Sequence, residues 1–276
     1  MFWHSRARTK RVQYIMKADN LPTNDSALDA NIQQYLRAVT TRGRDIERIG
    51  PFQATFSRSS TNPFLNYAIP DIDAEPSAHE VEQLIRAYQG RGLHPRLEYI
   101  TTCAPRVEAP LVAAGFVTEG RLALMTCRPG EERELPVPPG IELVRPQTDE
   151  ELFDLRTVQH EAYKDPEPPN RGDVEGVAAN LSAGGMAVLA RVPETREPVG
   201  AGEYTPALQG FSELTSVAVR SRFRRRGIAA AMTAWLLRVA FDAGVVVPFL
   251  MAEEAEERIY TRAGFRTTTR ILHISR

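Results

Sequence analysis

Apolar and polar residues alternate along residues 211–219, and this pattern predicts a β-strand. One face of that strand would carry Phe211, Glu213, Thr215, Val217 and Val219. From Ile228 to Val239 the apolar residues instead recur every three or four positions, which is typical of an amphipathic helix. Only a short loop separates the two elements, so the helix would begin close to the end of the strand.

The loop between this strand and this helix is rich in arginine and contains Gly227. The first N–H groups of a helix have no intrahelical acceptor, and they lie at the positive end of the helix dipole. Gly227 and Ala229 leave the turn free of bulky side chains, so a phosphate group could approach those N–H groups. The pattern therefore predicts a site for the phosphate groups of a nucleotide-bearing ligand.

Two motifs in this region resemble those of the GNAT (Gcn5-related N-acetyltransferase) superfamily. The spacing Arg224-x-x-Gly227-x-Ala229 after a strand resembles the acetyl-CoA signature of the family. The segment 259–265, Ile-Tyr-Thr-Arg-Ala-Gly-Phe, resembles a second landmark, a helix end of the form Leu-Tyr-x-x-x-Gly-Phe. Glu213 lies at the strand position from which histone-type members present a general base.

The resemblance implies a role for each of these positions. The strand and the loop would bind acetyl-CoA as a co-substrate, with the backbone holding the pantetheine arm and the pyrophosphate. Tyr260 would protonate the departing thiolate, and Glu213 would take the proton of the attacking amine directly or through water. A packing role for Tyr260 and a solvent-facing role for Glu213 are the alternatives. The residues that the resemblance assigns to acetyl-CoA are Val217, Ala218, Val219, Arg224, Arg225, Arg226, Gly227, Ile228, Ala229 and Ala230.

An internal repeat relates the two halves of the chain. Gly115-Phe116 aligns with Gly264-Phe265, and the alignment continues into the following segments, where Leu122 falls on Ile271. The chain thus resembles a tandem GNAT, with one repeated unit in each half.

The first copy lacks the features that carry the chemistry in the second. Leu111 occupies the position of Tyr260, and the segment 71–76 is acidic and ends in proline where a phosphate would bind. Acidic side chains repel a pyrophosphate, and proline has no N–H to donate. We therefore expect the first copy to be a degenerate domain that has a structural role or shapes the acceptor site.

The resemblance implies an α/β (α+β) fold with two mixed, mostly antiparallel, twisted sheets flanked by helices. We expect a degenerate domain over residues 20–128, a proline-rich linker over 129–140 and a catalytic domain that binds acetyl-CoA over 141–276. The catalytic domain would contain a helix at about 149–163. Residues 1–19 would be a basic flexible arm; a targeting peptide or a natural start at Met16 are the alternatives.

Composition excludes several other classes of protein. The net charge of −1 gives no general attraction to nucleic acid or to anionic membranes, and no apolar run is long enough for a membrane span. The two cysteines, Cys103 and Cys127, are too few for a disulfide framework, and the five histidines lack metal-ligand spacing. We expect a soluble, cytoplasmic monomer or homodimer without a metal, whose partner is a small-molecule amine.

One position departs from the family pattern. Seven residues before Tyr260, where many members have asparagine, this chain has Glu253, and further acidic residues follow it. An acidic surface beside the cofactor groove would favour a cationic acceptor, whereas the alternative is a solvated helix start.

The implied activity is transfer of the acetyl group to a primary amine by direct attack in a ternary complex. Two alternatives remain open at this stage. One is a CoA-binding sensor or scaffold without catalytic activity. The other is a tandem GNAT that works without CoA, such as an aminoacyl transferase.

Overall fold

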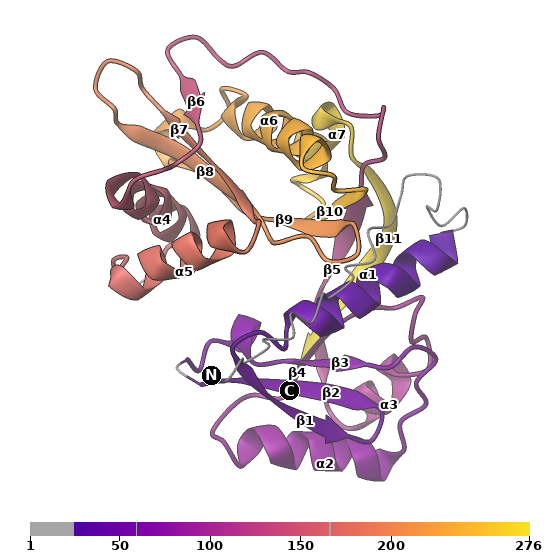
Figure 1. The fold of residues 1–276 in the computed structure, drawn as a ribbon. Helices are drawn as coiled ribbons and strands as arrows, with labels where there is room; N and C mark the ends of the chain where they lie inside the picture. The colour runs from indigo at the N-terminus through magenta and orange to yellow at the C-terminus, as the bar shows by residue number, and fades with distance from the viewer. Residues whose placement is uncertain (1–24, 59, 166) are drawn as a thin grey trace, which may run out of the picture.

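The computed structural model describes residues 25–58, 60–165 and 167–276 (Figure 1). The predicted basic arm at 1–19 lies outside these residues. Two copies of a mixed helix and strand unit follow one another, and residues 127–141 connect them without a helix or a strand. The first half of the chain precedes this connection, and the second half follows it.

Both halves contain helices and strands. The elements of the first half are α1 (Asp25–Val39), β1 (Arg44–Ile49), β2 (Phe52–Ser57), η2 (Pro63–Leu65), β3 (Ala68–Pro70), α2 (Ala78–Gln89), β4 (Arg96–Ile100), α3 (Glu108–Ala113) and β5 (Val117–Thr126). Those of the second half are β6 (Glu142–Val144), α4 (Asp149–Tyr163), α5 (Arg171–Ser182), β7 (Met186–Arg191), β8 (Pro198–Tyr204), β9 (Phe211–Val219), η3 (Ser221–Phe223), α6 (Ile228–Asp242), β10 (Val247–Ala252), α7 (Glu257–Ala263) and β11 (Arg266–Ser275). None of these helices, within the described part of the chain, is long and apolar enough to cross a bilayer.

The eleven strands of the described residues form one continuous sheet, in the order β1-β2-β3-β4-β11-β5-β10-β9-β8-β7-β6. The predicted α+β class is confirmed, but the prediction of two separate sheets is wrong. The halves are joined because each gives its last strand to the other. β5 pairs with β10 of the second half, and β11 pairs with β4 of the first half. Local sequence patterns specify strands but not such distant partners, so the exchange could not be predicted.

The two exchanged strands lie side by side between the halves (Figure 1). In their antiparallel register Leu122 lies opposite Ile271, and Ala123 lies opposite Arg270. The internal repeat aligns Leu122 with Ile271, so two equivalent residues face each other. This is the arrangement expected at a local two-fold axis between the repeats.

The helices of the second half cover both faces of its part of the sheet. Apolar residues of α6, including Ile228, Met232 and Leu236, pack on one face. Residues of α4 and α5, among them Leu155 and Val177, pack on the other. α4 begins after Thr148, whose hydroxyl accepts the N–H of Glu151 at 3.2 Å in a capping box. These helices fix the strand and the loop on which the predicted site lies.

Candidate active site

A cavity of about 980 Å³ opens where β9 and β10 diverge. The two strands pair in parallel only from Phe211 to Glu213 on β9, opposite Val247 to Phe249 on β10. Beyond this point β9 continues beside β8, and β10 continues beside β5. The cavity lies between the diverging strands, and it is lined by β9, the following loop, the first turn of α6, α7 and the end of α4.

A β-bulge at Ser216 interrupts β9 inside the cavity. Ser216 has φ 55°, and the pairing of β9 with β8 shifts between Ala201 and Glu203. As a result Leu214, Val217 and Val219 all contribute to the core beneath α6, whereas Ala218 packs beneath α4. The predicted alternation is therefore wrong beyond Thr215, because it assumed a regular strand. The extra residue is what turns Val217 and Val219 towards α6.

α4 holds the bulge through two side chains. The Gln159 side-chain amide donates to the Ser216 carbonyl at 3.1 Å, and the Tyr163 hydroxyl donates to the Val217 carbonyl at 3.2 Å. Tyr163 also lines the cavity. Its role could not be predicted from the sequence, because its partner is a backbone carbonyl on a distant strand.

The predicted phosphate loop ends in a helix N-terminus that has no side-chain cap. Gly227 is the N-cap residue of α6, with φ 86°, and no side chain accepts a hydrogen bond from the first turn. The first intrahelical bond of this turn runs from the Ala231 N–H to the Gly227 carbonyl at 3.0 Å. The N–H groups of Ile228, Ala229 and Ala230 therefore have no acceptor within the helix, and all three residues line the cavity.

The corresponding helix of the first half is closed by its own side chains. Ser77 caps α2, accepting the Glu80 N–H at 3.3 Å, and the Glu80 carboxylate accepts the Ser77 N–H at 2.8 Å. Asp71, in the predicted acidic segment, accepts from Arg48 at 2.8 Å and pairs with Arg37 at 2.9 Å. Leu111, at the position of the second half's tyrosine, is fully buried. These contacts support the interpretation of the first half as degenerate.

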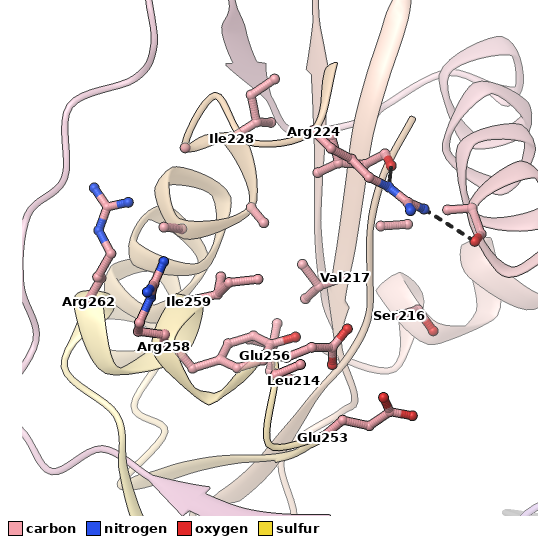
Figure 2. Close-up of a pocket in the computed structure, with 18 of the residues that line it drawn as sticks. Leu214, Ser216, Val217, Arg224, Ile228, Glu253, Glu256, Arg258, Ile259 and Arg262 are labelled. Atoms are coloured by element: carbon pink, nitrogen blue, oxygen red, sulfur yellow. Dashed lines mark hydrogen bonds between the residues drawn. The ribbon is translucent and has the colours of Figure 1, made fainter. Parts of the chain in front are cut away.

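The arginines of the loop differ in what they contact. Arg224 donates to the carbonyls of Val219 at 3.0 Å and Ala162 at 3.5 Å, as the dashed lines in Figure 2 show. Arg226 lies outside the cavity lining; it donates to the Arg222 carbonyl at 3.2 Å and stacks on Phe223.

Arg222 itself pairs with Glu197. Arg225 lines the cavity and makes no ion pair with another described residue. Contacts with other parts of the protein thus hold the side chains of Arg222, Arg224 and Arg226. The Arg225 side chain makes no hydrogen bond or ion pair with another described residue, so it is available to a ligand.

Two further arginines line the cavity from α7, and the sequence analysis missed both. Arg258 and Arg262 lie one helical turn apart, on the other side of the cavity from Arg224 (Figure 2). Their spacing on the helix that carries Tyr260 was the signal available in the sequence.

Tyr260 lies on α7 and lines the cavity with only 8% of its surface exposed. Burial, together with the nearby Glu256 and Tyr163, raises the pKa of its hydroxyl well above the ordinary value. The hydroxyl is therefore protonated at neutral pH. A protonated phenol that lines a cavity is able to donate a proton or a hydrogen bond to a ligand.

Glu213 lies at the point where β9 and β10 part, and it is half-buried. Its burial and the charge of Glu98, on β4 of the first half, raise the pKa of Glu213 to about 8. A carboxylate with this pKa can accept a proton near neutral pH. The contribution of Glu98 could not be predicted, because it depends on how the two halves pack together.

Acidic side chains gather at the end of the cavity away from the phosphate loop. Glu253 and Glu256 line it, and Figure 2 shows Glu253 at the opposite end from Ile228 and Arg224. Partial burial and the charge of Glu253 raise the pKa of Glu256. The cavity is thus basic at one end and acidic at the other.

Comparison with known proteins agrees with this geometry. Residues 150–265 match the model of the acetyltransferase (GNAT) family. A GCN5-related N-acetyltransferase from Kribbella flavida has a similar structure, with a TM-score of 0.74 and 23% identity over 90% of this chain and 95% of that chain. A second, from Sphaerobacter thermophilus, has a TM-score of 0.61 and 16% identity over 81% and 76% of the two chains.

A tandem GNAT protein from the clavulanic acid biosynthesis pathway is also similar, with a TM-score of 0.61 and 11% identity over 95% of this chain and 96% of that chain. No curated protein matches the sequence. Residues 150–265 therefore match the acetyltransferase (GNAT) family, and the chain as a whole has a fold similar to that of a tandem GNAT protein.

Proposed function

We propose that this protein is an acetyl-CoA-dependent N-acetyltransferase whose second half carries out the reaction on a small-molecule primary amine. The observation that carries the proposal is that Glu213, Tyr260 and the uncapped N-terminus of α6 line one cavity. A phosphate-binding end, a proton acceptor and a proton donor are the three components that the reaction needs.

The residues present fit acetyl-CoA as a co-substrate. The N–H groups of Ile228, Ala229 and Ala230 and the side chain of Arg225 would hold the pyrophosphate. The β9 backbone from Val217 to Val219 would run beside the pantetheine arm. When bound, acetyl-CoA supplies a thioester, which is an activated acyl group.

Glu213 would act on the acceptor. An alkyl ammonium has a pKa near 10, so the amine carries a proton at neutral pH and cannot attack in that form. Glu213 would accept that proton, and the neutral amine nitrogen would then attack the thioester carbonyl carbon. The raised pKa of Glu213 is closer to the pKa of the ammonium group than that of an ordinary carboxyl group is. Proton transfer from the ammonium to Glu213 is therefore less unfavourable.

Tyr260 would act on the leaving group. As the bond between the carbonyl carbon and sulfur breaks, the electron pair goes to sulfur, and the Tyr260 hydroxyl would give it a proton. Negative charge develops on sulfur as the bond breaks, and burial keeps the Tyr260 hydroxyl protonated until that point, so the proton would be available when sulfur becomes basic enough to take it. The amide forms directly, without an acyl-enzyme, and the nitrogen that now bonds the carbonyl carbon would give its second proton to the Tyr260 phenolate.

The acidic end of the cavity supports a cationic acceptor. Glu253 and Glu256 would attract an amine that carries additional positive charge and would disfavour an acidic one.

Two measurements test the proposal. The first is release of the CoA thiol from acetyl-CoA over a panel of amines that includes polyamines, amino sugars and lysine derivatives. The second is calorimetric titration with acetyl-CoA. Turnover with one or more amines is the expected result. Binding without turnover on any amine would favour the sensor, and absence of binding would favour a reaction that does not use CoA.

A further inference from the structure

We infer that Arg258 and Arg262 form a second phosphate site in the cavity, which takes the 3′-phosphate on the ribose of coenzyme A. This inference rests on the proposed function, since it assigns the ligand of the same cavity. The α6 N-terminus and Arg225 are proposed to bind the pyrophosphate, whereas this inference concerns the 3′-phosphate.

The two arginines form a paired basic surface. They lie at positions i and i+4 of α7, on the same side of the helix, and both line the cavity. Like charges at this spacing destabilise a helix, and α7 is short. An anion held between them would remove that repulsion.

Neither arginine has an acidic partner within the described part of the chain, whereas neighbouring arginines do. Arg266 pairs with Glu131 at 3.2 Å, and Arg270 pairs with Glu257 at 2.9 Å. Arg258 and Arg262 are exposed, and their guanidinium groups are free to bind a ligand. They thus differ from the arginines that brace the fold.

Their position separates them from the pyrophosphate site. α7 packs against α6, and Figure 2 shows the arginine pair apart from Ile228 at the start of α6. Figure 2 shows both arginines across the cavity from Arg224 and the β9 strand. A ligand whose pyrophosphate lies on the α6 N-terminus would reach the pair with its nucleoside end.

The chemistry of that end selects a phosphate monoester. Coenzyme A carries two phosphates in its pyrophosphate and a third on the 3′ carbon of the ribose. A phosphate monoester, like a phosphorylated side chain, has a charge of about −1.5 to −2 at neutral pH. Guanidinium groups bind such oxygens in pairs of hydrogen bonds, which suits two arginines on one helix face.

Dephospho-CoA lacks only this group, so it is the matched probe. Calorimetric titration at low ionic strength would compare CoA with dephospho-CoA on the wild type and on Arg258→Gln/Arg262→Gln. We expect the wild type to prefer CoA by about tenfold or more, as for a charge-assisted contact of this kind. The double variant should lose this preference, while its affinity for dephospho-CoA changes little.

Arg238→Gln is the matched control for removal of an exposed arginine. Arg238 lies on α6, pairs with Glu134 at 3.9 Å and does not line the cavity, so this variant should keep the preference. Circular dichroism of each variant would establish that it is folded. Arg258→Lys/Arg262→Lys keeps the charge and should retain part of the preference.

The outcomes separate this inference from the proposed function. Equal affinity of the wild type for the two ligands, or an unchanged preference in the folded glutamine double variant, would overturn the 3′-phosphate site while leaving CoA binding intact. Binding of neither ligand to the wild type would overturn both.

Discussion

The hydroxyl group of Tyr35, on α1, forms a hydrogen bond with the hydroxyl group of Thr205, which follows β8 in the other half. The same threonine hydroxyl accepts the Glu213 N–H at 3.0 Å. The Tyr35 ring also packs edge-on against Phe249 at 5.2 Å, and Phe249 is the residue paired with Glu213 on β10. The first half therefore holds the backbone of the proposed base from two sides.

Tyr35→Phe removes the hydroxyl and keeps the ring. We expect kcat to fall by roughly fivefold to tenfold, as when a positioning hydrogen bond worth about 1 kcal/mol is lost. The affinity for acetyl-CoA should not change, because Tyr35 does not line the large cavity. Initial rates and calorimetric titration would measure the two quantities.

Tyr99→Phe is the control for this substitution. Tyr99 is fully buried in the first half, and its hydroxyl has no hydrogen-bond partner among the described residues. An equal loss of kcat in both variants would show that the effect is a general one on the first half, and that Tyr35 has no particular connection to Glu213.

Tyr260→Phe tests the proton donor. The ring is retained, so packing against Phe265 at 6.5 Å is kept while the proton is lost. We expect kcat to fall by about 100-fold or more, within the range for a general acid, with little change in the affinity for acetyl-CoA. A variant with wild-type kcat would reduce Tyr260 to a packing residue and leave water as the proton source.

Glu213→Gln tests the proton acceptor through its pH dependence. The pKa of about 8 lies above the ordinary value of 4.5, so the carboxyl group still holds a proton at neutral pH and loses it as the pH rises through 8. In the wild type, kcat/KM should therefore rise with pH and level off above about pH 8. In Glu213→Gln the rise should continue to about pH 10, where the amine itself loses its proton.

A pH–rate profile over this range distinguishes the possibilities. If the break near pH 8 survives in Glu213→Gln, it belongs to another group. If the variant has a lower rate by the same factor at every pH, the carboxylate orients the acceptor and bulk water accepts the proton.

Gly227→Asp and Gly227→Asn form a matched pair at the α6 N-terminus. Both side chains tolerate a positive φ better than other non-glycine residues do, and neither would clash at its Cβ, which would lie in ordinary van der Waals contact with Pro138 at 3.9 Å. They differ in charge. Aspartate should weaken acetyl-CoA binding by about tenfold more than asparagine, because it places a carboxylate where phosphate oxygens would lie.

Titration calorimetry of the two folded variants would measure the difference. Equal affinities would mean that no phosphate lies at this helix end, and the assignment of the loop would be lost. Gly227→Ala adds a separate measure of strain, with an expected cost of about 1 kcal/mol in stability from its left-handed backbone.

The parts of the structure that the sequence predicted well are those with local causes. The helix at 149–163 begins after Thr148, which forms a capping box with Glu151. The strand at 211–219 was predicted from its alternation, although the faces assigned beyond Thr215 were wrong. The loop at Gly227 could be predicted because glycine and small neighbouring residues are the residue types that such a turn requires, and Gly227 has a positive φ.

The parts that it missed depend on distant residues. The bulge at Ser216 is held by Gln159 and Tyr163 of α4, and the pKa of Glu213 depends on Glu98 in the other half. The sequence shows the helical spacing of Arg258 and Arg262, but that both line one cavity depends on the packing of α7 against other elements. No local pattern carries such information.

The exchange of β5 and β11 has a consequence for synthesis of the protein. β4, near residue 100, is paired on one side by β11, whose Ile271 lies opposite Ile100. While the ribosome is still translating the second half, the emerging first half has an unpaired edge that its own chain cannot yet cover, and such edges promote aggregation. The first half therefore completes its sheet only when the last strand has left the ribosome, and degradation or stalling late in translation would leave both halves unfinished.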